Sequence, residues 1–126
     1  MSPVVLDTSA VAAVIFGEPD AEAFAAALTR HGGELSISAV TRVELEIVLE
    51  ARQGSEAVSD AEAMFDRLGV ITEPVDAAQA SAAFAAWRRF GKGRHPAGLN
   101  LLDCFSYALA RAAAVSYTHL TLPTKA

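Results

Sequence analysis

Short apolar runs alternate along the chain with segments in which apolar residues recur at helical spacing. Residues 3–6 form a continuous apolar run, which is typical of a strand buried on both faces. Apolar and polar residues alternate over 35–38, and residues 70–72 form another short run with the character of a strand. The pattern therefore predicts three short strands.

The remaining segments predict helices over 10–16, 21–30, 40–52, 55–68, 76–90 and from 100 onward. Several are preceded by side chains that can cap a helix, including Asp20, Asn100 and a capping box from Asp76 to Gln79. Strands that alternate with helices indicate a single α/β domain with a mostly parallel sheet.

Composition limits the kinds of protein this can be. The net charge of −5 gives no overall attraction for nucleic acid, so any RNA contact requires a local basic patch. A single cysteine excludes an internal disulfide and a cysteine-based zinc site. Because we find no signal-peptide pattern and no apolar run of about 20 residues, we expect a cytoplasmic protein that does not span a membrane.

Three acidic residues follow or adjoin the predicted strands. Asp7 ends the first strand, Glu44 lies one turn inside the helix after the second, and Asp103 lies in the first turn of the last helix. Ligands of open α/β sheets bind beyond the carboxyl ends of the strands, so these acids are expected to meet at one sheet edge. Carboxylates that close repel by about 4 kcal/mol per pair, which favours a bound cation.

Oxygen ligands without cysteine favour a hard ion, Mg²⁺ or Mn²⁺. Such an ion suits phosphodiester hydrolysis, because it can activate a water molecule and stabilise phosphate charge. Each acid also has an ordinary explanation. Asp7 could cap a helix, Asp103 could interact with a helix dipole, and Glu44 could be a solvated surface residue, as we expect for Glu46 and Glu50.

A basic segment lies before the last helix. It places four of the ten lysines and arginines within seven residues, with aromatic side chains beside them: Arg88, Arg89, Lys92 and Arg94, next to Trp87, Phe90 and His95. Cations interleaved with aromatics suit single-stranded RNA, through phosphate contacts and base stacking. The alternative is a solvated helix end whose aromatic residues, Trp87 and Phe90, pack inward.

Two other kinds of chemistry have weaker support. Cys104 lies on an apolar helix face, which favours a small core residue over a nucleophile. An aspartyl-phosphate mechanism of the haloacid-dehalogenase type would use Asp7 as nucleophile. That mechanism needs a second aspartate two residues on, where this chain has Ser9.

Residues 4–10, 41–52 and 100–110 together resemble, in order and spacing, the three acidic motifs of PIN domains, and the last is most similar to that of VapC-type toxins. The resemblance implies a three-layer α/β/α fold and an endonuclease that cleaves single-stranded RNA with Mg²⁺ or Mn²⁺. It implies Asp7, Glu44 and Asp103 as ligands, with Thr8 or Ser9 orienting a ligand or water. It also implies a homodimer, inhibited by a small antitoxin in a bacterial toxin–antitoxin pair.

The chain departs from this pattern at its C-terminal end. The resemblance covers residues 1–115, whereas residues 116–126 are rich in threonine and contain no acid where the family has one or two further aspartates. The abrupt change suggests sequence from another source, such as read-through into adaptor DNA. A missing ligand would weaken the metal site, so the alternative function is a catalytically weak PIN-fold module that holds an antitoxin.

Overall fold

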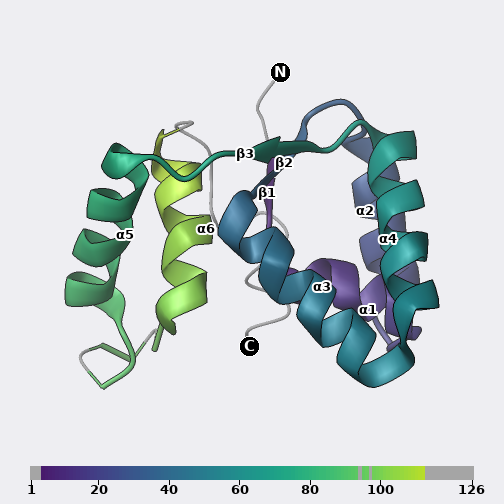
Figure 1. Cartoon of the computed structure of the whole chain (residues 1–126), viewed down its shortest axis with the longest axis horizontal. Helices are drawn as coiled ribbons and strands as arrows, with labels where there is room; N and C mark the ends of the chain where they lie inside the picture. The colour runs from purple at the N-terminus through teal and green to yellow at the C-terminus, as the bar shows by residue number, and fades with distance from the viewer. Residues whose placement is uncertain (1–3, 94, 97, 113–126) are drawn as a thin grey trace.

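The computed structural model of the chain describes residues 4–93, 95–96 and 98–112. The predictions for residues 113–126 therefore lie outside the described residues. Figure 1 shows the elements, which in chain order are β1 (Val4–Leu6), α1 (Thr8–Phe16), α2 (Ala21–Arg30), β2 (Leu35–Ser38), α3 (Ala39–Gln53), α4 (Ser55–Leu68), β3 (Ile71–Glu73), α5 (Ala77–Phe90) and α6 (Leu101–Ala112). Within the described ranges, none of the helices is long and apolar enough to cross a membrane.

The three described strands form one parallel sheet in the order β1-β2-β3. Val4 pairs with Leu35 and Leu6 pairs with Ile37, so the carboxyl ends of β1 and β2 lie at the same edge. The predicted α/β class with a mostly parallel sheet is confirmed.

Helices cover the sheet on both faces, as Figure 1 shows. Alternate residues of the strands, including Val4, Leu6 and Ile37, belong to a buried apolar cluster with side chains of α1, α2, α3 and α4. Val5 points the other way, into a cluster with Leu109 of α6. The pair α5 and α6 forms its own apolar contact outside that face, which gives the α/β/α layers.

The end of α4 explains why β3 begins one residue later than predicted. Gly69 adopts a left-handed conformation with φ of 67°, and its N–H donates to the Asp66 carbonyl. The Val70 N–H then donates to the Phe65 carbonyl at 2.9 Å, which closes a Schellman motif. Because this hydrogen bond uses the Val70 N–H to close α4, the strand starts at Ile71.

The predicted capping box at the start of α5 forms only by half. The Gln79 N–H donates to Asp76 Oδ1 at 2.9 Å, as a helix cap requires. The Gln79 side chain does not complete the box but instead donates from Nε2 to the Ala108 carbonyl at 3.3 Å. Tertiary contact with α6 has replaced the local hydrogen bond.

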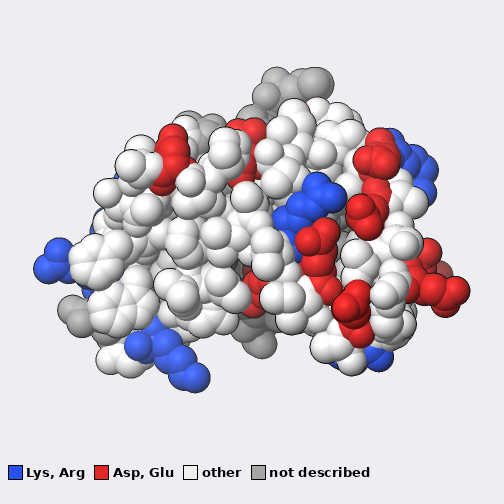
Figure 2. Space-filling model, in the orientation of Figure 1, with Lys and Arg blue, Asp and Glu red and all other residues white. Residues whose placement is uncertain are grey.

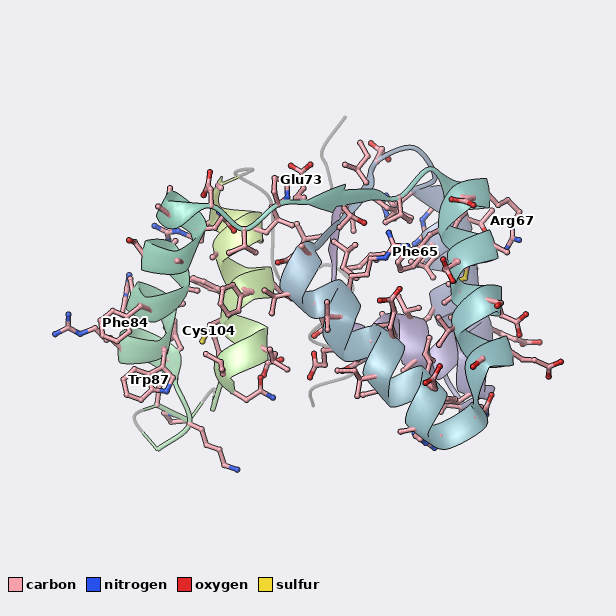
Figure 3. The ribbon with its side chains drawn as sticks, in the orientation of Figure 1. Phe65, Arg67, Glu73, Phe84, Trp87 and Cys104 are labelled. Carbon is pink, nitrogen blue, oxygen red and sulfur yellow. The ribbon has the colours of Figure 1, made fainter. Side chains whose placement is uncertain are left out.

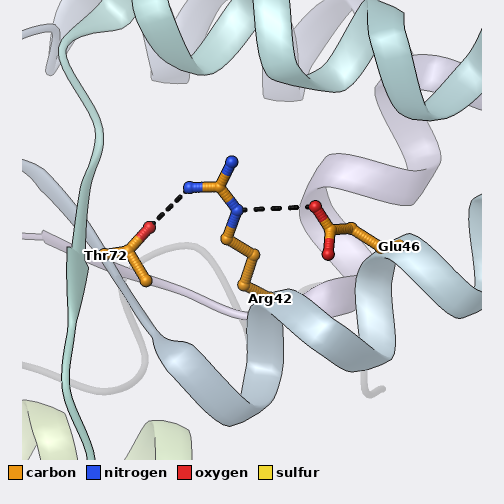
Figure 4. Close-up of polar contacts among 3 residues, drawn as sticks. All are labelled: Arg42, Glu46 and Thr72. Atoms are coloured by element: carbon orange, nitrogen blue, oxygen red, sulfur yellow. Dashed lines mark hydrogen bonds and ion pairs between the residues drawn. The ribbon is translucent and has the colours of Figure 1, made fainter.

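Arg42 on α3 contacts both β3 and α4. Its guanidinium donates to Thr72 Oγ1 at 2.6 Å and lies 3.6 Å from Glu46 Oε2, as Figure 4 shows. The same group lies 5.5 Å from the centre of the Phe65 ring on α4. One side chain thus joins α3 to its neighbours on the side away from α6.

Candidate active site

Asp7 lies directly beyond the carboxyl end of β1 and is only 2% exposed. It is the N-cap of α1, and its Oδ1 accepts a hydrogen bond from the Ser9 N–H at 2.9 Å. This contact explains why α1 begins at Thr8, two residues earlier than predicted. The capping role expected for Asp7 is confirmed, and it leaves the carboxylate at the edge of the sheet where a ligand would bind.

Glu44 contacts the same turn from α3. Thr8 Oγ1 donates to Glu44 Oε1 at 2.5 Å, so the two elements that follow β1 and β2 are joined by a polar contact. The neighbouring acids of α3 have other partners, since Glu46 pairs with Arg42 and Glu50 accepts from Ser55 Oγ at 3.1 Å. The structure therefore distinguishes Glu44 from both.

Asp103 lies in the first turn of α6, where it is 8% exposed. Its N–H donates to Asn100 Oδ1 at 2.8 Å, and the Asn100 N–H donates back to Asp103 Oδ2 at 3.1 Å. This reciprocal pair works as a capping box, with aspartate in the position usually taken by glutamate. Asn100 was predicted to cap this helix, but the bond back to the Asp103 carboxylate was not predicted.

The donors suit a hard divalent cation in their chemistry, because they are carboxylate oxygens without sulfur or imidazole. Among the described residues, however, no group of three or more histidine, cysteine, aspartate or glutamate side chains is close enough to hold a metal ion. Glu44 is bonded to Thr8, and Asp103 is bonded to Asn100. In each case the bond uses one carboxylate oxygen, Oε1 of Glu44 and Oδ2 of Asp103.

Buried hydroxyl groups accompany the acids, and the sequence did not single them out. The polar or charged residues that are buried, among those described, are Asp7, Ser38, Thr41, Asp103 and Ser106. Thr41 Oγ1 and Ser106 Oγ lie 3.0 Å apart and join α3 to α6. Thr41 precedes Glu44 by one helical turn, and Ser106 follows Asp103 by one turn, so this contact fixes the two acid-bearing helices relative to each other.

The basic segment occupies the far end of α5. Arg88 lies in its last turn with the guanidinium 5.3 Å from the Phe84 ring centre, and Arg89 lies 5.1 Å from the Phe90 ring centre. Lys92 is exposed in the following loop, while Arg94 lies outside the described residues. In Figure 2, cations project around the α5 end of the molecule, whereas acids gather over α3 and α4.

The aromatic residues of this segment take different positions. Phe84 and Trp87 stack with ring centres 6.1 Å apart, and they are 57% and 37% exposed. Figure 3 shows both on the outer side of α5, away from α6, so the alternative in which Trp87 packs inward is wrong. Phe90 is half-buried with its ring centre 5.4 Å from that of Tyr107, and for this residue inward packing is confirmed.

Gly91 supports the position of Trp87. A Cβ atom at Gly91 would lie 2.4 Å from the Trp87 carbonyl oxygen and 2.6 Å from the indole Cδ1. Any other residue would therefore displace the end of α5 or its exposed indole ring.

Cys104 belongs to the core between α5 and α6, as predicted. Its side chain is fully buried, and its Sγ donates to the Asn100 carbonyl at 3.2 Å. Burial raises the pKa of the Cys104 thiol, and the negative charge of Asp103 raises it further. Both effects disfavour the thiolate, so this cysteine is a poor nucleophile.

Comparison with known proteins decides the family. A model of the PIN domain matches residues 4–117. The chain belongs to the PIN-domain family. Among its relatives is Ribonuclease VapC of Mycolicibacterium smegmatis, which is 44% identical over 108 residues that cover 86% of this chain and 83% of the relative. Ribonuclease VapC30 of Mycobacterium tuberculosis is 45% identical, with 86% and 82% covered.

Comparison with a solved structure confirms the fold. It is that of VapC20 from Mycobacterium tuberculosis, described as a toxin that cleaves the sarcin–ricin loop. The two chains superpose with a TM-score of 0.73 over 89% of this chain and 84% of the other, at 20% identity. The predicted PIN-like α/β/α fold is confirmed by this likeness.

Proposed function

We propose that this chain is a metal-dependent endoribonuclease that cleaves single-stranded regions of RNA, and that it is the toxin of a toxin–antitoxin pair. The observation that carries the proposal is the Thr8–Glu44 contact, which brings the acid of α3 to the turn that holds Asp7. Asp7 and Glu44 thus lie on neighbouring segments. The relatives of the chain at 44% and 45% identity are named ribonucleases.

In this proposal Asp7, Glu44 and Asp103 hold Mg²⁺ or Mn²⁺. The bound ion would supply an activated water and stabilise charge on the phosphate. Ser9 holds the Asp7 carboxylate through its backbone N–H, and Thr8 holds the Glu44 carboxylate. Both residues therefore orient the ligands, because each holds one oxygen of an acid through a hydrogen bond.

RNA would bind along the end of α5. Arg88, Arg89, Lys92 and Arg94 would contact phosphates, and the exposed Trp87 ring would stack on a base. The loop after α5 leads directly to Asn100 and the Asp103 carboxylate. A single-stranded RNA segment bound to this loop would therefore lie beside the acidic residues of the site. Exposure of Trp87 and Phe84 supports this role, since aromatic rings that served only the core would be buried.

The proposal includes a homodimer and a cognate antitoxin. Val43 and Ile47 on α3 are 54% and 63% exposed, and with Val58 of α4 they line a groove of about 530 Å³. A small amphipathic segment of an antitoxin would cover the apolar side chains of this groove, which is also lined by Glu46 and Glu50. The alternative function, a catalytically weak module that only holds an antitoxin, is favoured by the lack of acids in residues 116–126.

Cleavage of a mixed RNA substrate tests the proposal. We expect cleavage with Mn²⁺ or Mg²⁺, none with chelator, and a loss of at least about 100-fold in Asp103→Asn or Glu44→Gln, because loss of a ligand should exceed the 10–100-fold effects of outer partners. Glu46→Gln is the matched control on the same helix, and it should cleave like the unchanged chain.

The outcome also separates the two functions. Cleavage that chelator does not reduce, or that survives Glu44→Gln, would contradict the metal-site proposal. No cleavage by the unchanged chain, restored when an aspartate-bearing C-terminal segment replaces residues 116–126, would assign the present chain to the binding-module alternative.

A further inference from the structure

Ser38 carries a buried hydroxyl group that makes no hydrogen bond within the described part of the chain. The residue is only 1% exposed. Burying a hydroxyl without a partner is unfavourable, so such groups are rare in folded proteins.

The position of Ser38 makes the missing partner more unusual. Ser38 is the N-cap of α3, where a serine side chain normally accepts a hydrogen bond from the second or third N–H of the helix. No such bond is made, although the backbone has the extended conformation of an N-cap, with φ of −65° and ψ of 142°. The hydroxyl is therefore not used by the helix that it begins.

The sheet register places Ser38 beside Asp7. Leu6 pairs with Ile37, so Asp7 and Ser38 occupy the next position on the two parallel chains. Side chains alternate along a strand, which puts both residues on the face where Val5 contacts α6. Asp103 is carried by α6, so Ser38 lies on the side of the sheet that holds two of the three acids.

We propose that Ser38 is a positioning residue of the acid site, whose hydroxyl becomes hydrogen bonded when the site takes up a hydrated divalent cation. The inference rests on the proposed function, because it requires that the acids bind such a cation. Hydrated Mg²⁺ and Mn²⁺ keep several waters, and each water has protons that a neighbouring oxygen can accept. Ser38 supplies an oxygen that no described group occupies.

Ser106 provides the matched control, because it is another buried hydroxyl that already has a partner in Thr41. We would compare Ser38→Ala, the nearly isosteric Ser38→Cys, and Ser106→Ala in the full chain. One readout is the thermal unfolding midpoint in chelator, and the other is Mn²⁺ affinity by calorimetric titration without RNA.

The two sites should respond in opposite ways. We expect both Ser38 variants to weaken Mn²⁺ binding about tenfold, as outer partners of metal ligands do, while Ser38→Ala keeps or raises the unfolding midpoint in chelator. Ser106→Ala should lower that midpoint, because it leaves Thr41 without its buried partner.

Three results would each reject a different part of the proposal. Mn²⁺ affinity within twofold of the unchanged chain in both Ser38 variants would reject the positioning role alone. A lowered midpoint in Ser38→Ala with unchanged Mn²⁺ affinity would make Ser38 an ordinary structural residue. No Mn²⁺ binding by the unchanged chain would reject the proposed metal site itself.

Discussion

The half of the molecule formed by the sheet and α1 to α4 differs from the α5–α6 pair in charge and in surface. Fourteen of the fifteen acidic residues precede Ala77, whereas six of the ten lysines and arginines follow it. The one acid after Ala77 is Asp103. An acidic protein can therefore present a basic face, because opposite charges are gathered at opposite ends of the chain.

The two halves also differ in how they use aromatic side chains. In the first half Phe65 is buried against the core and lies beside Arg42. On α5, Phe84 and Trp87 are exposed and stacked, with the Arg88 guanidinium over the Phe84 ring. The contrast suggests a division in which the first half supplies most of the acid site and the second half holds the substrate.

Removing cations from each half is the strongest test of this division. Arg88→Ala with Lys92→Ala should weaken RNA binding about tenfold and lower the salt slope of binding by roughly 1.4, since each lost phosphate contact to a single strand contributes about 0.7. Fluorescence anisotropy with a labelled RNA, repeated over a range of salt concentrations, measures both quantities.

The matched control is Arg30→Ala with Arg67→Ala, which removes the same charge from exposed positions of the acidic half. It should leave the salt slope unchanged. Equal losses in the two double variants would show that only net charge matters and would remove the basis of the comparison.

Trp87→Ala should also weaken RNA binding, but without changing the salt slope. Stacking of one base on an aromatic ring contributes about 1–3 kcal/mol, so RNA affinity should fall about fivefold or more while the unfolding midpoint stays nearly constant. Ile47→Ala removes an exposed apolar side chain from the acidic half and should leave RNA affinity unchanged. A large loss of stability in Trp87→Ala would instead identify the indole as part of the packing.

The smallest effect concerns Cys104, which lies between α5 and α6. Because burial and Asp103 raise its pKa, the folded chain keeps the thiol proton at a pH where the unfolded chain loses it. The free energy of unfolding should therefore fall slightly as pH rises above the ordinary thiol pKa, and Cys104→Ala should remove that dependence. Rapid alkylation of the native thiol at mildly alkaline pH would contradict this assignment.

Much of the fold could be predicted because its signals are local. Asp7, Asp76 and Asn100 cap helices where the pattern placed them, and Gly69 ends a helix. The order of strands and helices then left few arrangements, because parallel strands need a helical connection. The positions of Asp7 and Asp103 follow from the same local signals, since each lies at the beginning of a helix, while the role of the three acids as ligands stays a prediction.

The parts that could not be predicted depend on contacts between distant segments. Ser38, Thr41 and Ser106 are small polar residues whose burial becomes apparent only when α6 lies against the sheet. Gln79 has a local partner available but uses the Ala108 carbonyl of α6. Trp87 has an apolar ring that favours burial, yet it lies on the outer side of α5.

The length of β3 has a consequence for how partners can attach. β3 forms one edge of the described sheet, is three residues long, and is held to α3 by the Arg42–Thr72 hydrogen bond. A strand arriving from another molecule would gain very few backbone hydrogen bonds there, which protects the fold from edge-to-edge aggregation. Association by β-augmentation is therefore disfavoured at this edge. A partner molecule is expected to bind to side chains of the surrounding helices instead.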